Sequence, residues 1–119
     1  MSVPVYLDGC IIPATVKEVR SEDAPDFPER VIIPGEMKIW YRAMAIYDRT
    51  RLSFYQQDKE LTMKIRIPYW DGIHAGDVVM VNGDQQSVFN ASVAWTQDGV
   101  KETELTLISP VAKYKVVSG

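Results

Sequence analysis

The clearest alternation of apolar and polar residues lies at positions 61–67, where the sequence reads LTMKIRI. A period of two sends successive side chains to opposite faces of a strand, so this pattern predicts a half-buried β-strand. The same period returns at 100–108, where Leu105 and Leu107 are expected to face the core and Glu104 to face away. Both segments favour antiparallel sheet with one covered face.

Dipeptides that favour tight reversals separate the apolar runs of the second half. Asn-Gly at 82–83 and Asp-Gly at 98–99 tolerate positive φ at little steric cost. They predict hairpins that join expected strands at 77–81, 88–95 and 100–108. The first of these strands is almost continuously apolar, as expected of a central strand.

The first half of the chain has weaker β patterns, with strands expected at 3–7, 10–19 and 37–47. An Asp-Gly step at 8–9 predicts a reversal between the first two. Pro13 lies inside the second. Because proline cannot donate to a ladder, we expect that strand at a sheet edge or with a bulge. The third has apolar residues on both faces, which predicts a strand covered on both sides.

Two segments break the β pattern. Residues 21–30 read SEDAPDFPER, with four acidic residues and two prolines in ten positions. They offer too little apolar surface to offset the entropy of ordering, which predicts a flexible loop. Within it, Phe27 either packs back onto the domain or contacts a partner. Segment 48–58 loses the period of two, and Asp48 or Thr50 is suited to cap a short helix there.

Together these patterns predict a mainly β fold, a small antiparallel β-barrel or sandwich with one short helix and a long acidic loop. With 119 residues the chain suits a single β-barrel domain that spans 1–119. The C-terminal tail 110–119 is expected either to add an edge strand or to project outward.

Charge, cysteine content and hydropathy narrow the classes of partner. The formal net charge is −3, from 13 basic and 16 acidic residues, which disfavours broad binding to phosphate backbones. The single cysteine cannot form an internal disulfide, which suits a reducing compartment. No stretch approaches the roughly 20 consecutive apolar residues of a membrane span, and the start has no signal-peptide pattern. We therefore expect no membrane partner.

Candidate chemistry is sparse. Cys10 and His74 are too few for a zinc site, and no glycine-rich phosphate-binding motif occurs, so neither metal nor cofactor is expected. A small hydrolase using Cys10 and His74 is one alternative. Against it, Cys10 has no basic neighbour or helix N-terminus to activate its thiol, and His74 is expected to be an exposed turn residue. Glu102 and Glu104 are expected on a solvated strand face beside Lys101.

A second alternative is an OB-like nucleic-acid-binding module. Such modules bind single strands through aromatic side chains interleaved with basic ones, and Trp40, Tyr41 and Lys64 offer this combination. The negative net charge argues against this alternative, and both aromatic residues also suit a core or a subunit interface.

Longer segments carry a resemblance to a family. The sequence reads IRIPYWDG at 65–72, IHAGDVVMVNG at 73–83 and ELTLI at 104–108, with YDRTRLSFYQQ upstream at 47–57. Their order and spacing, over about residues 40–109, resemble those of the phage head–tail joining proteins, also called head-closure or stopper proteins. Stopper, head-completion adaptor and tail terminator remain open as subtypes.

The resemblance implies a non-enzymatic β-barrel subunit of a homo-oligomeric ring below the portal, which joins head to tail and helps to retain packaged DNA. Its partners would be copies of itself, portal or adaptor and tail proteins, and passing phage DNA, without sequence specificity. It would belong to the head–tail junction of the virion, after assembly in the cytoplasm of a bacterial host. The residues expected at a partner interface or lumen are Glu22, Asp23, Asp26, Phe27, Arg49, Arg51, Tyr55 and Gln56.

Overall fold

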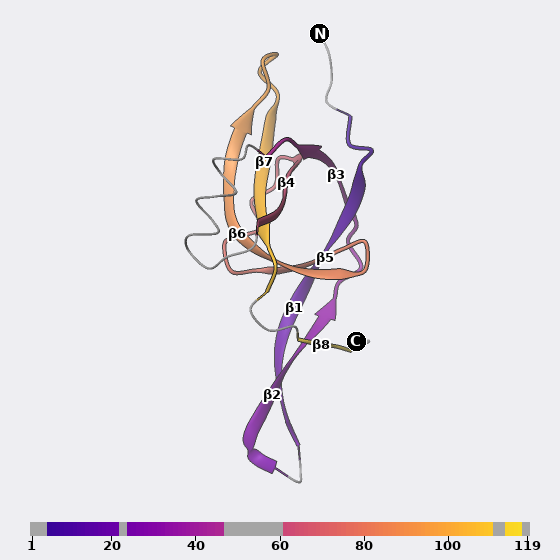
Figure 1. Cartoon of the computed structure of the whole chain (residues 1–119), viewed down its shortest axis with the longest axis vertical. Helices are drawn as coiled ribbons and strands as arrows, with labels where there is room; N and C mark the ends of the chain where they lie inside the picture. The colour runs from indigo at the N-terminus through magenta and orange to yellow at the C-terminus, as the bar shows by residue number, and fades with distance from the viewer. Residues whose placement is uncertain (1–4, 22–23, 47–60, 111–113, 118–119) are drawn as a thin grey trace.

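A computed structural model describes residues 5–21, 24–46, 61–110 and 114–117 of the chain. The fold of these residues is mainly β, as the sequence predicted, and they contain no helix. The strands, labelled in Figure 1, are β1 (Gly9–Ser21), β2 (Ala24–Pro34), β3 (Ile39–Met44), β4 (Leu61–Pro68), β5 (Val78–Val81), β6 (Asp84–Trp95), β7 (Lys101–Ile108) and β8 (Lys115–Val116).

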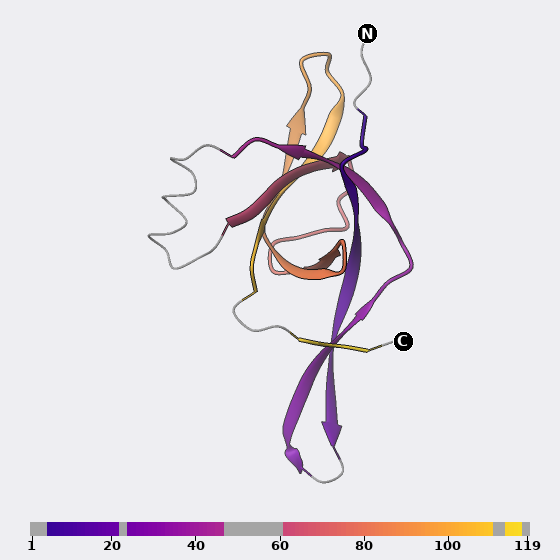
Figure 2. The same ribbon diagram turned by 45° about the vertical axis from the view of Figure 1, so that its right-hand side comes forward.

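Six of the described strands close into a ring. The hydrogen-bonded order β3-β4-β7-β6-β5-β1 is completed by antiparallel pairing of β1 with β3, at Gly9↔Tyr41 and Ile11↔Ile39. β2 pairs with β1 outside this ring, and β8 pairs in parallel with β2. Figure 2 shows the ring and the β1–β2 hairpin that extends away from it. Ring closure pairs strand edges that would otherwise be free around the core.

Side chains that face into the ring form the core. Leu61, Ile65 and Ile67 of β4 are buried, as the alternation predicted, and Leu105 and Leu107 of β7 are fully buried. The cluster of buried residues comprises Ile11, Tyr41, Ile65, Ile67, Ile73, Val79, Val81, Val88, Leu105 and Leu107. Every strand of the ring contributes to this cluster, so formation of the core depends on closure of the ring.

Two predicted reversals are confirmed. Asn82 and Gly83 have φ angles of 51° and 90°, and Val81 pairs directly with Asp84. A two-residue turn with both φ angles positive matches the twist of the flanking strands. β6 therefore begins earlier than predicted, because pairing resumes immediately after the turn. The second reversal places Gly99 at a φ of 84° between β6 and β7.

Pro13 lies in a central strand, so the edge position, one of the two predicted outcomes, is wrong; β1 does have an irregularity, but it lies between Val19 and Ser21. β1 pairs with β5 on one side and with β2 on the other. The Pro13 carbonyl accepts a hydrogen bond from the Gly35 N–H at 2.9 Å, just beyond the end of β2. The N and C=O of one strand residue point to the same side, so the donor that proline lacks falls where β2 has ended. The ladder between β1 and β5 therefore loses no hydrogen bond.

The segment predicted to be a flexible acidic loop is a strand over residues 24–30, which belong to β2. Ala24, Glu29 and Arg30 pair with β1 in antiparallel register, at Ser21↔Ala24, Val19↔Glu29 and Glu18↔Arg30, with a register shift between Val19 and Ser21. The loop prediction is wrong for this strand because it weighed only buried apolar surface, whereas pairing with β1 also satisfies backbone groups of a polar segment. We call residues 15–21 and 24–30 together the arm.

The arm gives the molecule an elongated shape. Its principal extents are 59 × 35 × 21 Å, and its radius of gyration of 16.1 Å exceeds the roughly 13 to 14 Å of a compact domain of this length. Figure 1 shows the arm leaving one end of the ring, while the N-terminal segment and the β6–β7 hairpin lie at the other. The molecule therefore has two structurally different ends.

The N-terminal segment is not the strand predicted at 3–7. Its described residues belong to no strand before β1 begins. The Asp8 backbone N–H donates to the Tyr41 carbonyl at 3.0 Å, but the Ala43 N–H donates to the Asp8 carboxylate at 2.7 Å. A side chain thus takes the place of a backbone acceptor, which ends regular pairing with β3 at this point.

Three further predictions concern β3 and the segments around it. The strand expected at 37–47 is present but covered on one face, because Tyr41 faces the core at 2% exposure while Trp40 faces outward. The tail 110–119 contributes an edge strand, β8, which is one of the two predicted outcomes. The helix expected at 48–58 lies outside the described residues.

Candidate interaction surfaces

Glu102 is the centre of a charged cluster on the outside of the ring. Its carboxylate accepts hydrogen bonds from Arg42 Nη2 at 2.6 Å and Arg42 Nε at 3.2 Å, and from the Tyr6 hydroxyl at 2.7 Å. Arg66 Nη1 lies 3.4 Å from Glu102 and Arg66 Nε lies 3.2 Å from Glu104. Glu104 also lies 3.9 Å from Lys64 Nζ. The cluster therefore ties the N-terminal segment to β3, β4 and β7.

The pKa values of this cluster follow from its contacts. Burial alone would raise the pKa of Glu102, but the hydrogen bonds from Arg42 and Tyr6 and the positive charges of Arg42 and Arg66 outweigh it, so the pKa is lowered. Burial, the hydrogen bond to Glu102 and its negative charge raise the pKa of Tyr6 to about 12. The hydrogen bond to Glu102 raises the pKa of Arg42. All three groups keep their ordinary charge states at neutral pH.

The burial of Glu102 corrects a prediction. Sequence patterning placed Glu102 and Glu104 together on a solvated face, yet the Glu102 side chain is fully buried and that of Glu104 is 19% exposed. The covering groups are Tyr6 and Arg42, which are 96 and 60 residues away in sequence. No pattern among neighbouring residues in the sequence indicates that Glu102 is buried.

An apolar hollow lies beside this cluster, and we call it the Trp40 hollow. It has a volume of about 610 Å³ and is lined by Tyr6, Leu7, Met37, Lys38, Ile39, Trp40 and Pro68. The side chains of Leu7, Met37 and Trp40 are 79%, 53% and 55% exposed. Because the Tyr6 hydroxyl is bonded to Glu102, the buried cluster also fixes one wall of the hollow. Exposed apolar groups that gather around a concavity mark interaction sites.

A second, smaller hollow lies where β4 leads into its following loop. Its volume is about 190 Å³, and its lining includes Tyr69, Trp70 and Val93. Lys101 Nζ lies 3.8 Å from the centre of the Tyr69 ring and 5.9 Å from that of Trp95. These are cation–π distances, and both rings remain largely exposed. This hollow extends the exposed aromatic surface, and its lining also includes Asp71, His74, Ser92 and Thr103.

The arm exposes apolar side chains and free strand edges. Val16 and Val19 are 42% and 43% exposed. β1 pairs with the ring only as far as Ala14, and β8 covers β2 only at Val31 and Ile32. Among the described residues, the outer edges of the arm beyond these points have no partner strand. A two-stranded ribbon of this kind is only marginally stable alone and is open to pairing with another chain.

Most of the predicted interface residues lie outside the described part of the chain. These are Glu22, Asp23, Arg49, Arg51, Tyr55 and Gln56. The backbones of Asp26 and Phe27 belong to β2, within the arm, but their side chains are also outside it. The structure therefore brings two of the predicted positions onto a projecting element, and the Trp40 hollow is a surface that the sequence prediction missed. The sequence feature that could have indicated this hollow is Trp40, an aromatic residue in a predicted strand with apolar residues on both faces.

Cys10 and His74, the pair considered for hydrolysis, lie in different elements. Cys10 is half-buried in β1 and pairs with Trp40 of β3. His74 lies between β4 and β5 with its side chain 74% exposed, as predicted for a turn residue, and its Nδ1 is 3.9 Å from Asp77. No hydrogen bond joins Cys10 to His74. Among the described residues, no cluster of three or more His, Cys, Asp or Glu is arranged to hold a metal ion.

None of the described segments forms a helix long and apolar enough to cross a bilayer. No model of a known protein family matches the chain, and no curated protein matches it.

Proposed function

We propose that this chain is a structural virion protein that joins a phage head to its tail, as a subunit of a ring below the portal. In that position it helps to retain the packaged DNA. Its partners are copies of itself and the portal, adaptor and tail proteins on either side. The sequence resemblance suggests this role, and the surface features support it.

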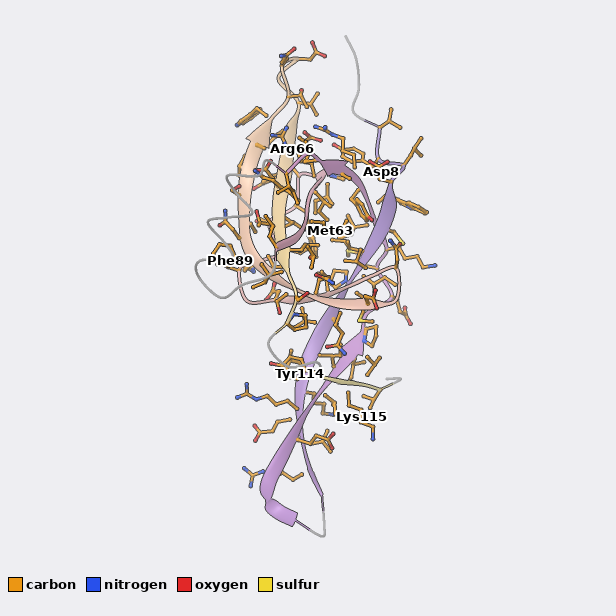
Figure 3. All side chains as sticks on the ribbon, in the orientation of Figure 1. Asp8, Met63, Arg66, Phe89, Tyr114 and Lys115 are labelled. Atoms are coloured by element: carbon orange, nitrogen blue, oxygen red, sulfur yellow. The ribbon has the colours of Figure 1, made fainter. Side chains whose placement is uncertain are left out.

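The observation that carries the proposal is the presence of two unlike surfaces, the Trp40 hollow and the arm, that no described residue covers. The Trp40 hollow is lined by the N-terminal segment and by residues 37–40 at the start of β3. Figure 3 labels Asp8, which follows Leu7 of the hollow, beside the ring, and the arm extends away from the ring on the other side. Unlike surfaces on one chain suit heterologous contacts, which generate rings when the rotation between copies closes.

A phage-assembly experiment tests this function. Deleting the coding sequence from the phage genome that carries it should give DNA-filled heads and separate tails, with heads that lose DNA. Supplying the chain in trans should restore joined particles, and purified virions should contain it. Normal infectious particles from the deletion mutant would contradict the proposal. Electron microscopy of the particles and mass spectrometry of their proteins give the two readouts.

The nucleic-acid-binding alternative receives less support from the residues predicted for it. Tyr41 is buried in the core at 2% exposure and offers no face for a base. Lys64 lies 3.9 Å from Glu104, which offsets its charge. Of the three residues predicted for this role, Trp40 is the one whose ring remains available to stack on a base. Titration with single-stranded DNA at low salt tests this alternative, and micromolar binding that is lost on Trp40→Ala would favour it over the structural role.

A further inference from the structure

We propose that the Trp40 hollow of one copy receives the arm of a second copy of this chain. The inference deepens the proposed function, on which its place in a ring rests, because it assigns the surfaces through which subunits join. No described residue covers either surface: the hollow lies against the ring, between the N-terminal segment and the start of β3, whereas the arm extends away from the ring. A single chain therefore cannot bring them together, whereas two copies can.

The two surfaces complement each other in shape. The hollow is an open apolar concavity with Trp40 and Leu7 at its surface. The arm is a projecting two-stranded ribbon with Val16 and Val19 exposed. Its outer edges also present unpaired backbone N–H and C=O groups to a neighbour. Insertion would remove apolar surface from water on both sides and give the ribbon the support that an isolated hairpin lacks.

Charge makes a second copy the favoured occupant. Val19 pairs with Glu29, so an apolar side chain and a carboxylate lie side by side on one face of the arm. Lys38 lines the hollow beside Trp40. Glu29 and Lys38 are both exposed, and neither makes an ion pair with any described residue. One surface thus carries an unpaired acid next to an apolar group, and the other an unpaired base next to apolar groups.

The positions of the other charged residues on the arm indicate which of its strands faces Lys38 of the neighbouring copy. Glu18 pairs directly with Arg30 across the hairpin, which balances charge on the opposite face. Lys17, two positions before Val19, lies on the same face as Val19 and Glu29 but on β1, so this face has its base on β1 and its acid on β2. The acidic position is therefore on β2, at Glu29, and β2 is the strand expected to approach Lys38 in the neighbouring copy.

Two double variants test the two sides of this contact, the arm and the hollow, separately. V19S/E29K removes the apolar and acidic groups of the arm, and W40A/K38E removes the aromatic and basic groups of the hollow. All four side chains are exposed, so both variants should fold, which circular dichroism and denaturation midpoints verify. The matched control is W95A/K101E, which changes an exposed aromatic residue and a lysine outside the hollow.

Sedimentation velocity over a wide concentration range gives the readout. The wild-type chain and W95A/K101E should self-associate alike, and each of the other variants alone should associate at least about tenfold more weakly. An equimolar mixture of the two impaired variants should form dimers and no larger species, because each mixed pair holds one intact arm and one intact hollow. No isologous contact behaves in this way.

Three results would overturn the inference: a wild-type chain that stays monomeric throughout, impaired variants that associate like the wild type, or a mixture that stays monomeric. Unchanged association of the two variants would leave the head–tail function standing with a different ring contact. Conversely, a phage deletion mutant that assembles normally would remove the function while the arm-to-hollow contact survived in solution.

Discussion

Arg42 holds the carboxylate of Glu102 through two hydrogen bonds, from Nη2 at 2.6 Å and from Nε at 3.2 Å, although the Glu102 side chain is fully buried. This two-point geometry matches the planar guanidinium to the carboxylate, and such bonds are stronger than those between neutral groups. Tyr6 adds a third donor at 2.7 Å. The pair therefore links β3 to β7 and keeps the N-terminal segment against the ring.

Loss of the Glu102 charge should destabilise the fold. Glu102→Gln keeps the shape of the side chain but leaves the Arg42 and Arg66 guanidinium groups without their shared counter-charge. We expect the free energy of unfolding to fall by about 2 to 3 kcal/mol. The control is Glu104→Gln, which removes a more exposed carboxylate and should cost less than about 1 kcal/mol. Urea denaturation of both variants measures the difference, and equal effects would contradict the central role of Glu102.

The pKa of the Glu102 carboxylate predicts how the stability of the fold changes as the pH falls. The pKa of Glu102 is lowered in the folded chain from its ordinary value of 4.5. A lowered pKa means that the stabilising contribution is complete above about pH 4.5 and is lost as the pH falls through the folded-state pKa. The stability difference between the wild type and Glu102→Gln should therefore shrink at acid pH. Denaturation midpoints measured from neutral pH downward test this, and a constant difference would be inconsistent with it.

At alkaline pH, ionisation of Tyr6 should lower the stability of the fold. Its pKa is raised from 10.0 to about 12, so its contribution is complete below pH 10 and is lost as the pH rises from 10 towards 12. The absorbance of tyrosinate should show a late step from Tyr6 in the wild type. Tyr6→Phe should remove that step. A late step that persists in the variant would assign it to another tyrosine.

The C-terminal strand depends on one side-chain amide. Gln85 accepts a hydrogen bond from the Tyr114 N–H at 2.9 Å and donates one to the Tyr114 carbonyl, and the Val117 N–H donates to the Ile32 carbonyl at 3.0 Å. Gln85→Ala should release β8, so the amides of Tyr114 and Val117 should exchange hydrogen faster while the ring amides stay protected. Gln86→Ala is the adjacent control and should change neither.

Much of the ring could be predicted because its signals are local. The alternation at 61–67 and the Asn-Gly step at 82–83 each fix structure within a few residues, and the structure confirms both. Leu105 and Leu107 followed from the same period of two. Where a face is set by its neighbours in sequence, composition and spacing are enough.

The features that sequence reasoning missed depend on distant partners. Glu102 was assigned to solvent because its covering residues, Tyr6 and Arg42, come from segments far along the chain. Residues 21–30 were assigned to a loop because acidic residues and prolines mask the pairing of Ala24, Glu29 and Arg30 with β1. Trp40 gave a signal that was ambiguous between core, interface and ligand contact. Only the closed ring shows that it faces outward while Tyr41 faces in.

Gly72 provides a test of packing at the end of β4. A Cβ atom at this position would overlap the indole of Trp70. The indole cannot easily move aside, because Trp70 packs on the core and its backbone N–H and C=O are both hydrogen-bonded to the Thr103 hydroxyl at 2.9 Å. We expect Gly72→Ala to lower the free energy of unfolding by roughly 1 to 3 kcal/mol.

A double-mutant cycle isolates the overlap between Gly72 and Trp70. Trp70→Leu alone should destabilise the fold because it removes packing, but adding Gly72→Ala to Trp70→Leu should cost little further, since the overlapping ring is gone. Asp71→Ala, at the exposed neighbouring position, is the control for a change in the turn itself and should be nearly neutral. Thermal denaturation of the four combinations gives the coupling energy. Strictly additive effects would show that the cost of Gly72→Ala arises from the backbone of the turn, and the proposed steric contact would then be wrong.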